Sequence, residues 1–86
     1  MTKDYVVLAQ LDYDLQDASE ELSKITELIH PNVEIDEEEF NVRMAHLYSH
    51  LNAAWNIRNL SSDDLESADE EQLELWKEFP RDLKPL

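Results

Sequence analysis

Two histidines, His46 and His50, are the residues of this chain whose type and spacing most directly suggest chemistry. They lie four positions apart, so on a helix both imidazole rings project from one face, where they could bind Zn²⁺ or Ni²⁺. Asp17 or Glu20, on a helix packed alongside, could supply a third ligand. The acid that a zincin motif places between its histidines is missing. The alternative to a metal site is a solvated helix edge where each histidine pairs with an acid. We adopt that interpretation, so no cofactor is expected.

Asparagine and aromatic side chains are concentrated in the same stretch of the chain. Asparagine is a poor helix former, because its amide competes for backbone hydrogen bonds. On a helical wheel, Tyr48, Asn52, Trp55 and Asn59 form one band beside the apolar positions, and Asn56 lies next to it. Tyrosine and tryptophan often anchor protein interfaces, so we predict that these five residues bind a partner. The alternative is that a C-terminal segment covers both aromatics and accepts hydrogen bonds from the amides.

The chain carries 21 Asp and Glu against 7 Lys and Arg, a formal net charge of −14. Acids are predicted on the outside of the first helix, where Asp14, Asp17 and Glu21 are assigned to partner binding. Carboxylates on a solvated helix are poor acid–base catalysts, because burial or a close charge is needed to shift a pKa. We therefore expect a protein without enzymatic activity. The acids either bind a basic partner, in the sharpest version as a mimic of nucleic-acid phosphates, or only keep the chain in solution.

Composition narrows the function classes further. The chain has no Gly and no Cys, which excludes glycine-rich phosphate loops, disulfides and thiolate metal sites. The negative charge disfavours direct binding to nucleic acids and to anionic membranes. No apolar run approaches the ~20 residues that cross a bilayer, and the N-terminus lacks a basic and apolar signal, so a cytoplasmic location is expected. These observations favour a small regulatory protein that binds a protein partner with a basic surface.

Hydrophobic periodicity predicts the elements that position these residues. Apolar residues recur at alternating spacings of three and four along the first segment, at Leu8, Leu11, Leu15, Ala18, Leu22, Ile25 and Ile29. This a/d pattern is typical of a coiled-coil-like helix, here expected over 5–29 and ended by Pro31, which lacks a backbone N–H. The first helix is therefore predicted to pack one apolar stripe against a partner helix.

A second helix is predicted from Asp36 to about Leu60. Asp36 can cap its start while Glu39 reaches back to complete a capping box. Ile35 and Phe40 occupy the two positions of a hydrophobic staple, which sets the direction in which the chain enters the helix. This is the clearest helix start in the sequence.

Two helices of nearly equal length joined by a short connection favour an antiparallel hairpin. Equal lengths matter because a longer helix would leave part of its apolar stripe bare. In the register that this arrangement implies, Leu22 lies near Met44 and Leu15 near Leu51. The predicted fold class is all-α, a long coiled-coil-like helical hairpin followed by a short third helix.

The third helix is predicted to begin at Ser62 or within 67–69 and to end at Phe79, before a proline. Residues 1–80 are then expected to form a single three-helix domain, and 81–86 a flexible tail. So short a helix covers the hairpin only in part. A homodimer that buries the uncovered apolar stripe is therefore an alternative to a monomer.

Overall fold

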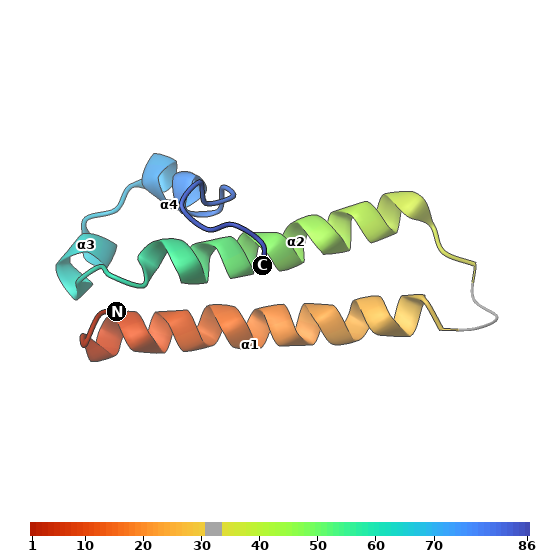
Figure 1. Ribbon diagram of the computed structural model, residues 1–86, viewed down its shortest axis with the longest axis horizontal. Helices are drawn as coiled ribbons and strands as arrows, with labels where there is room; N and C mark the ends of the chain where they lie inside the picture. The colour runs from red at the N-terminus through yellow and green to blue at the C-terminus, as the bar shows by residue number, and fades with distance from the viewer. Residues whose placement is uncertain (31–33) are drawn as a thin grey trace.

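Figure 1 shows an all-α chain in which two long antiparallel helices lie side by side. The computed structural model describes residues 1–30 and 34–86. The helices in these residues are α1 (Tyr5–Leu28), α2 (Glu37–Ile57), α3 (Ser62–Glu66) and α4 (Glu70–Trp76). The predicted fold class, a long helical hairpin followed by a short helical C-terminal part, is confirmed.

The C-terminal part is two short helices, α3 and α4, where the sequence predicts one. Both predicted starting regions are used. Ser61 caps α3 in a capping box with Asp64, and Asp69 caps α4 by accepting a hydrogen bond from Gln72 N. Capping side chains satisfy backbone N–H groups that the start of a helix leaves without partners. Asp69 has an extended backbone, so the helical path breaks there and the chain changes direction.

Aspartates begin both long helices. The carboxylates of Asp4 and Asp36 each accept a hydrogen bond at 3.0 Å from the backbone N–H two residues further on. The predicted cap at Asp36 is therefore confirmed. Glu39, which was expected to complete a capping box, accepts hydrogen bonds from Arg43 instead. Pro31, the predicted end of the first helix, lies outside the described residues.

The face of α1 that is turned toward α2 is not the predicted stripe. The residues buried on α1 are Val7, Asp14, Ala18, Glu21 and Ile25. The steps between these residues are seven, four, three and four positions, and the series shares only Ala18 and Ile25 with the predicted stripe. Leu15 and Leu22 are 44% and 50% exposed. The prediction of a purely apolar contact is therefore wrong, because α1 is rotated to turn two carboxylates inward.

The core and the register follow from this rotation. Ala18 and Ile25 of α1 pack with Leu47 of α2, and two partly buried residues of α2, Phe40 and Met44, cover the cluster. Two polar contacts cross the hairpin, an ion pair between Glu21 and Arg43 and a hydrogen bond between Asp14 and His50. These four residues directly precede the members of the two predicted contacts, Leu22 with Met44 and Leu15 with Leu51. The antiparallel register is therefore the predicted one.

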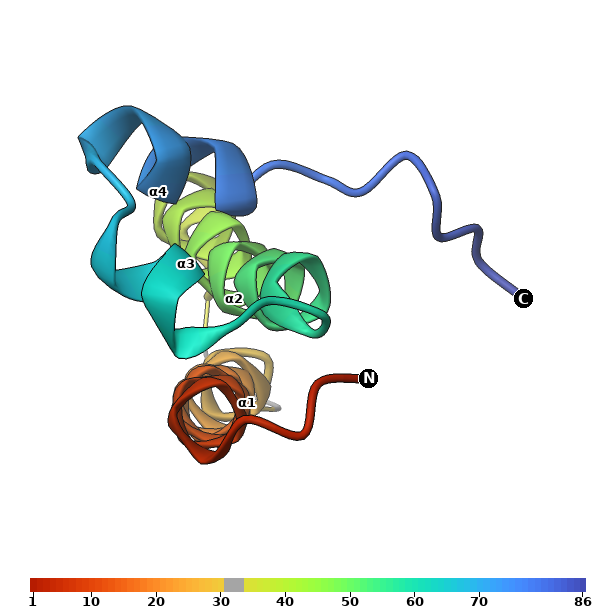
Figure 2. The ribbon, with the colours of Figure 1, turned by 90° about the vertical axis from the view of Figure 1, so that its left-hand side faces the viewer.

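The N-terminal residues and α3 close one end of the hairpin. Thr2 donates from its backbone N–H to Arg58 O at 2.7 Å and from Oγ1 to Leu60 O at 2.8 Å. The Asp4 carboxylate that caps α1 also accepts from Ser62 N at 2.7 Å. α3 packs on α1 and α4 on α2. Figure 1 shows both short helices toward one end of the hairpin, and Figure 2, which looks along the hairpin from that end, shows α4 on the side of α2 that faces away from α1. No helix among the described residues is both long and apolar enough to cross a membrane.

Candidate functional site

One flank of the contact between α1 and α2 is polar. We call this flank the polar seam and define it by Asp14, Asp17, Glu21, Arg43, His46 and His50. The three carboxylates come from α1 and the three basic side chains from α2. Polar groups taken out of water are stable only when they are hydrogen-bonded. Over the part of the chain that the structure describes, every buried side-chain nitrogen and oxygen has a partner.

The two histidines lie at the centre of the polar seam. His50 Nδ1 is 3.1 Å from Asp14 Oδ1, and His46 Nδ1 is 3.3 Å from Glu21 Oε2. The two Nε2 atoms are 3.2 Å apart. Asp17 Oδ2 lies 3.8 Å from His50 Nε2, on the outer side of the seam. The prediction that both histidines pair with acids of the first helix is confirmed.

The acids predicted on the outside of the first helix divide into two groups. Asp14 and Glu21 are only 7% and 5% exposed, so their predicted place on an outer partner-binding surface is wrong. They are buried because the basic side chains of α2 bind them. Asp17 is half-buried beside the histidines, whereas Glu20, the other predicted metal ligand, is exposed. The burial also removes two carboxylates from the row that a nucleic-acid mimic would present.

Two asparagines of the predicted partner-binding band hold the end of α4. Asn52 Nδ2 donates to Lys77 O and Asn56 Nδ2 to Trp76 O, both at 2.8 Å. These carbonyls lie at a helix C-terminus, where backbone oxygens lack partners within the helix. For these two residues, the alternative interpretation of internal hydrogen bonding is confirmed, and their amides are not free for a partner. Asn59 is exposed, and its partner-binding role stays a prediction.

The aromatic residues of the band contact the C-terminal segment. Trp55 Nε1 donates to Asp82 Oδ1 at 3.0 Å, and Arg58 stacks on the Trp55 ring while pairing with Asp82. The hydrogen bond from Trp55 holds the pKa of Asp82 below its ordinary value. The Tyr48 and Phe79 ring centroids are 5.1 Å apart. Part of the tail that was predicted to be flexible is therefore bound to α2, while both band aromatics remain partly exposed.

The flank opposite the polar seam is apolar and half open. We call it the apolar flank and define it by Leu15 and Leu22 of α1 with Tyr48 and Leu51 of α2, which are between 39% and 50% exposed. Successive residues of a helix point about 100° apart, so residues that follow members of the seam turn to the other side of the contact. A groove of about 580 Å³ continues this flank toward Phe79 and the C-terminal tail.

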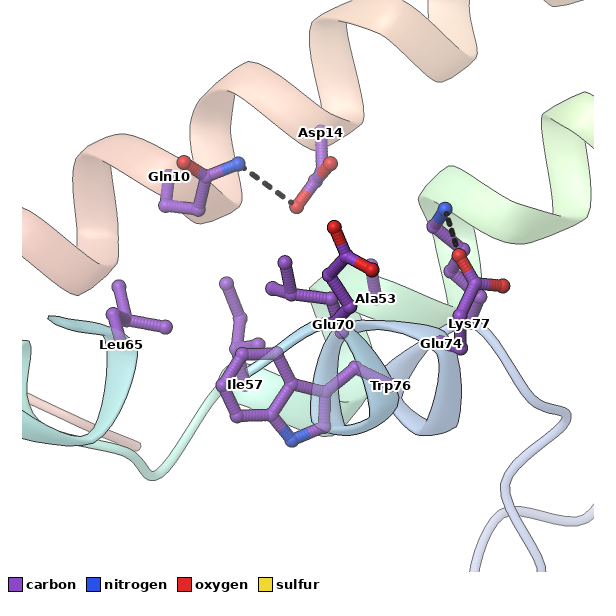
Figure 3. Close-up of a pocket in the computed structure, with 10 residues that line it drawn as sticks. Gln10, Asp14, Ala53, Ile57, Leu65, Glu70, Glu74, Trp76 and Lys77 are labelled. Carbon is purple, nitrogen blue, oxygen red and sulfur yellow. Dashed lines mark hydrogen bonds and ion pairs between the residues drawn. The ribbon is translucent and has the colours of Figure 1, made fainter. Parts of the chain in front are cut away.

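A cleft of about 530 Å³ lies between α1, α2 and α4 (Figure 3). It exists because α4 packs on α2 but not on α1. Its lining combines apolar side chains with polar and charged ones, namely Ala53, Ile57, Leu65, Leu73 and Trp76 with Gln10, Asp14, Glu70, Glu74 and Lys77. In Figure 3, Asp14 and Gln10 project from α1 toward the side on which Glu70 stands on the C-terminal helix.

The lining of the cleft is negatively charged, with three carboxylates and one ammonium group. Glu74 is paired with Lys77 at 3.0 Å, and Asp14 Oδ2 accepts from Gln10 Nε2 at 3.4 Å. Glu70 is exposed at the start of α4. A lysine or arginine side chain has an apolar stem and a cationic end, so it matches both parts of this lining.

The sequence carries little signal for this cleft. Read as one helix, the C-terminal segment places Trp76 on a face with Leu65 and leaves Leu73 at the edge of that face. The break before α4 changes this arrangement and brings all three into one wall. The hint in the sequence is Asp69, a second capping residue that follows shortly after Ser61. Because a helix has only one N-cap, two capping residues so close together indicate two short helices.

Comparison with known proteins adds no relationship to this geometry. No family model matches the chain, and no curated protein or solved structure matches it. The function is therefore argued from the contacts, burial and charge of the residues described above.

Proposed function

We propose that this protein is a small non-enzymatic regulatory protein that acts in the cytoplasm and binds a basic segment of a partner protein in the cleft between α1 and α4. One observation carries the proposal: an apolar wall and several carboxylates line the same cleft. A basic, partly apolar segment can bury hydrocarbon against the wall while its cationic groups approach the acids. Amphipathic helices that dock in grooves commonly bind in this way, with their apolar face against the groove.

The charge of the whole chain supports a basic occupant. Of its seven Lys and Arg, three (Arg43, Arg58 and Lys77) lie within 3.4 Å of a carboxylate of the same chain, which locally offsets their positive charge, and the net charge is −14. A strongly negative surface raises the association rate of basic partners and makes binding sensitive to salt. A second copy of the chain carries the same −14 and is repelled at long range, which disfavours a homodimer as the occupant.

The proposal is tested with a synthetic amphipathic peptide of leucine and lysine. Trp55→Phe leaves Trp76, in the wall of the cleft, as the only tryptophan, so its fluorescence reports occupation. We expect the peptide to shift the Trp76 emission and to bind more weakly as salt is raised. A leucine and glutamate peptide of the same pattern should not bind.

Two pairs of matched variants place the binding in the cleft. Glu70→Gln and Glu71→Gln remove the same charge from neighbouring positions, but only Glu70 lines the cleft. Leu73→Ser and Leu75→Ser change residues that are both 47% exposed, and only Leu73 lines it. We expect the cleft variants to weaken binding by about two- to fivefold and the controls to have little effect.

Other outcomes would favour the alternatives. Equal losses from Glu70→Gln and Glu71→Gln, with no effect of Leu73→Ser, would mean binding through charge alone, as expected of a nucleic-acid mimic. Binding that is insensitive to salt and to all four variants would point to the apolar flank. A dimer by light scattering, lost in Leu22→Ser, would identify that flank as a contact between two copies.

A further inference from the structure

We propose that His46 and His50 form a binding site for a divalent transition-metal ion, with Zn²⁺ as the ion to be tested. The two imidazoles meet on the polar seam through their Nε2 atoms. Neither ring lines the cleft assigned to the partner, and the two sites share only Asp14, which lines the cleft and lies behind His50.

The carboxylates behind the rings determine which nitrogens can bind a metal. His46 Nδ1 faces Glu21 Oε2 and His50 Nδ1 faces Asp14 Oδ1, and an ionised carboxylate only accepts hydrogen bonds. Each Nδ1 therefore carries the proton of its ring. In metal sites a carboxylate on Nδ1 orients the ring in the same way and leaves Nε2 as the ligand atom.

This assignment leaves two lone pairs facing each other. With each Nδ1 directed at a carboxylate, both Nε2 atoms are left as acceptors, and they lie 3.2 Å apart. Two acceptors at this distance repel each other. A metal ion bound to both Nε2 atoms would remove this repulsion.

The distance between the rings fits a metal ion. With zinc–nitrogen bonds of about 2.0–2.1 Å and tetrahedral angles, two ligand nitrogens are separated by about 3.3–3.4 Å. The observed 3.2 Å is close to that separation. The ring planes are tilted by 57° with their centroids 4.8 Å apart, so the rings are not stacked face to face.

The surroundings favour a cation that exchanges with solvent. Asp14, Asp17 and Glu21 place three carboxylates next to the pair, whereas Arg43, the arginine of the polar seam, is already bound to Glu21 and Glu39. The His46 side chain is 59% exposed, which leaves an entry path. Among the described residues, no group of three or more His, Cys, Asp or Glu side chains is already placed to hold a metal ion. Water and a rotation of the Asp17 carboxylate, now 3.8 Å from His50 Nε2, complete the coordination.

Titration with Zn²⁺, followed through the ring nitrogen resonances of the histidines, tests this inference. We expect the Nε2 signals of His46 and His50 to shift at micromolar Zn²⁺, while those of His30, the third histidine, do not. Because the ion binds only the folded chain, the unfolding midpoint should rise by roughly 10 °C or more at about a hundredfold excess of Zn²⁺ over its Kd.

Matched variants locate the site. His46→Gln alters a largely exposed side chain and should fold normally, yet it should weaken Zn²⁺ binding by more than the roughly 10–100-fold typical of changes to the carboxylates behind metal ligands. His30→Gln removes a histidine from outside the seam and should bind as the original chain does. Light scattering in the same titration should show one chain per ion.

Three results would overturn the inference. The first is a pair of His46 and His50 signals that stay unmoved by Zn²⁺. The second is equal Zn²⁺ affinity in His46→Gln and His30→Gln. The third is a stoichiometry of one ion per two chains, which would assign the metal to a contact between molecules and not to this pair of rings.

Discussion

Asp14 of α1 and His50 of α2 face each other across the helical hairpin, with Oδ1 and Nδ1 3.1 Å apart in a largely buried setting. The pair replaces an apolar contact at the centre of the hairpin. It also links the two functional regions, because Asp14 lines the cleft through the same carboxylate that orients a histidine of the polar seam. The packing of α1 on α2 and the chemistry of both regions therefore depend on one side chain.

Breaking this pair from either side is expected to destabilise the fold. Asp14→Leu or His50→Leu leaves the other polar group buried without its partner, which costs about 1–3 kcal/mol. The double variant should lose less than the sum of the single variants, with a coupling of at least about 0.5 kcal/mol. Urea unfolding with a chelator present measures all four proteins. The exposed pair of Glu74 and Lys77 is the control, with a coupling near zero, and additive losses at both pairs would contradict the prediction.

The rotation of α1 predicts which of its apolar residues matter for stability. Ile25 is 4% exposed in the core cluster, whereas Leu22 is half exposed on the apolar flank. Ile25→Ala should therefore destabilise the chain by about 2–4 kcal/mol, and Leu22→Ala by less than about 1 kcal/mol. The measurement is the free energy of unfolding in urea. Equal losses would mean that the stripe expected from sequence faces α2 in solution.

The amide of Asn52 is expected to hold α4 on the hairpin. Asn52→Ala removes the donor to Lys77 O and leaves that carbonyl at a helix end without its partner, at a cost of about 1–2 kcal/mol. Asn59→Ala changes an exposed asparagine just after the end of α2, and its free energy of unfolding should stay within about 0.5 kcal/mol of that of the original chain. Hydrogen exchange should show faster exchange in α4 for the first variant only. Unchanged exchange in both would contradict this role.

The carboxylate of Asp4 makes stability depend on pH. The backbone N–H of Ser62 is the main cause that lowers the pKa of Asp4 below its ordinary value of 3.8. A lowered pKa in the folded state means that the carboxylate stabilises the fold above the unfolded-state pKa, and that this contribution is lost as the pH falls through the folded-state pKa. Asp4→Asn should thus be less stable than the original at pH 7, with the difference shrinking below about pH 4.

Thermal unfolding at several pH values measures this difference. Glu27→Gln removes one charge from an exposed position of α1 and is the control for net charge. If both variants show the same pH dependence, the effect comes from overall charge and not from the bond between Asp4 and Ser62.

Local signals in the sequence were enough to predict the two long helices and their antiparallel direction. Asp36 predicts the start of α2 because capping is a contact between near neighbours, and the lengths of the two segments predict an antiparallel pair. The pairing of His46 and His50 with acids of α1 also follows, because four-residue spacing puts both rings on one face.

Contacts between distant residues decided the rest. From the sequence, Asn52 and Asn56 were predicted to bind a partner, because no signal in the neighbouring residues shows that the end of α4 packs against them. The cleft was missed for the same reason, since its wall forms only after the chain turns at Asp69 and returns along α2. Both features join residues separated by twenty or more positions.

The sequence by itself determined two amphipathic helices, their antiparallel register and a strongly negative surface. Only the tertiary structure decided which side of α1 turns inward, because the predicted and the buried stripes share Ala18 and Ile25 and elsewhere differ by one residue, as at Leu15 against Asp14 and Leu22 against Glu21. The basic side chains of α2 settle that choice, because their polar contacts with Asp14 and Glu21 form only in the rotation that leaves Leu15 and Leu22 half exposed. Periodicity describes one helix, whereas the buried face depends on the charges that its neighbour presents.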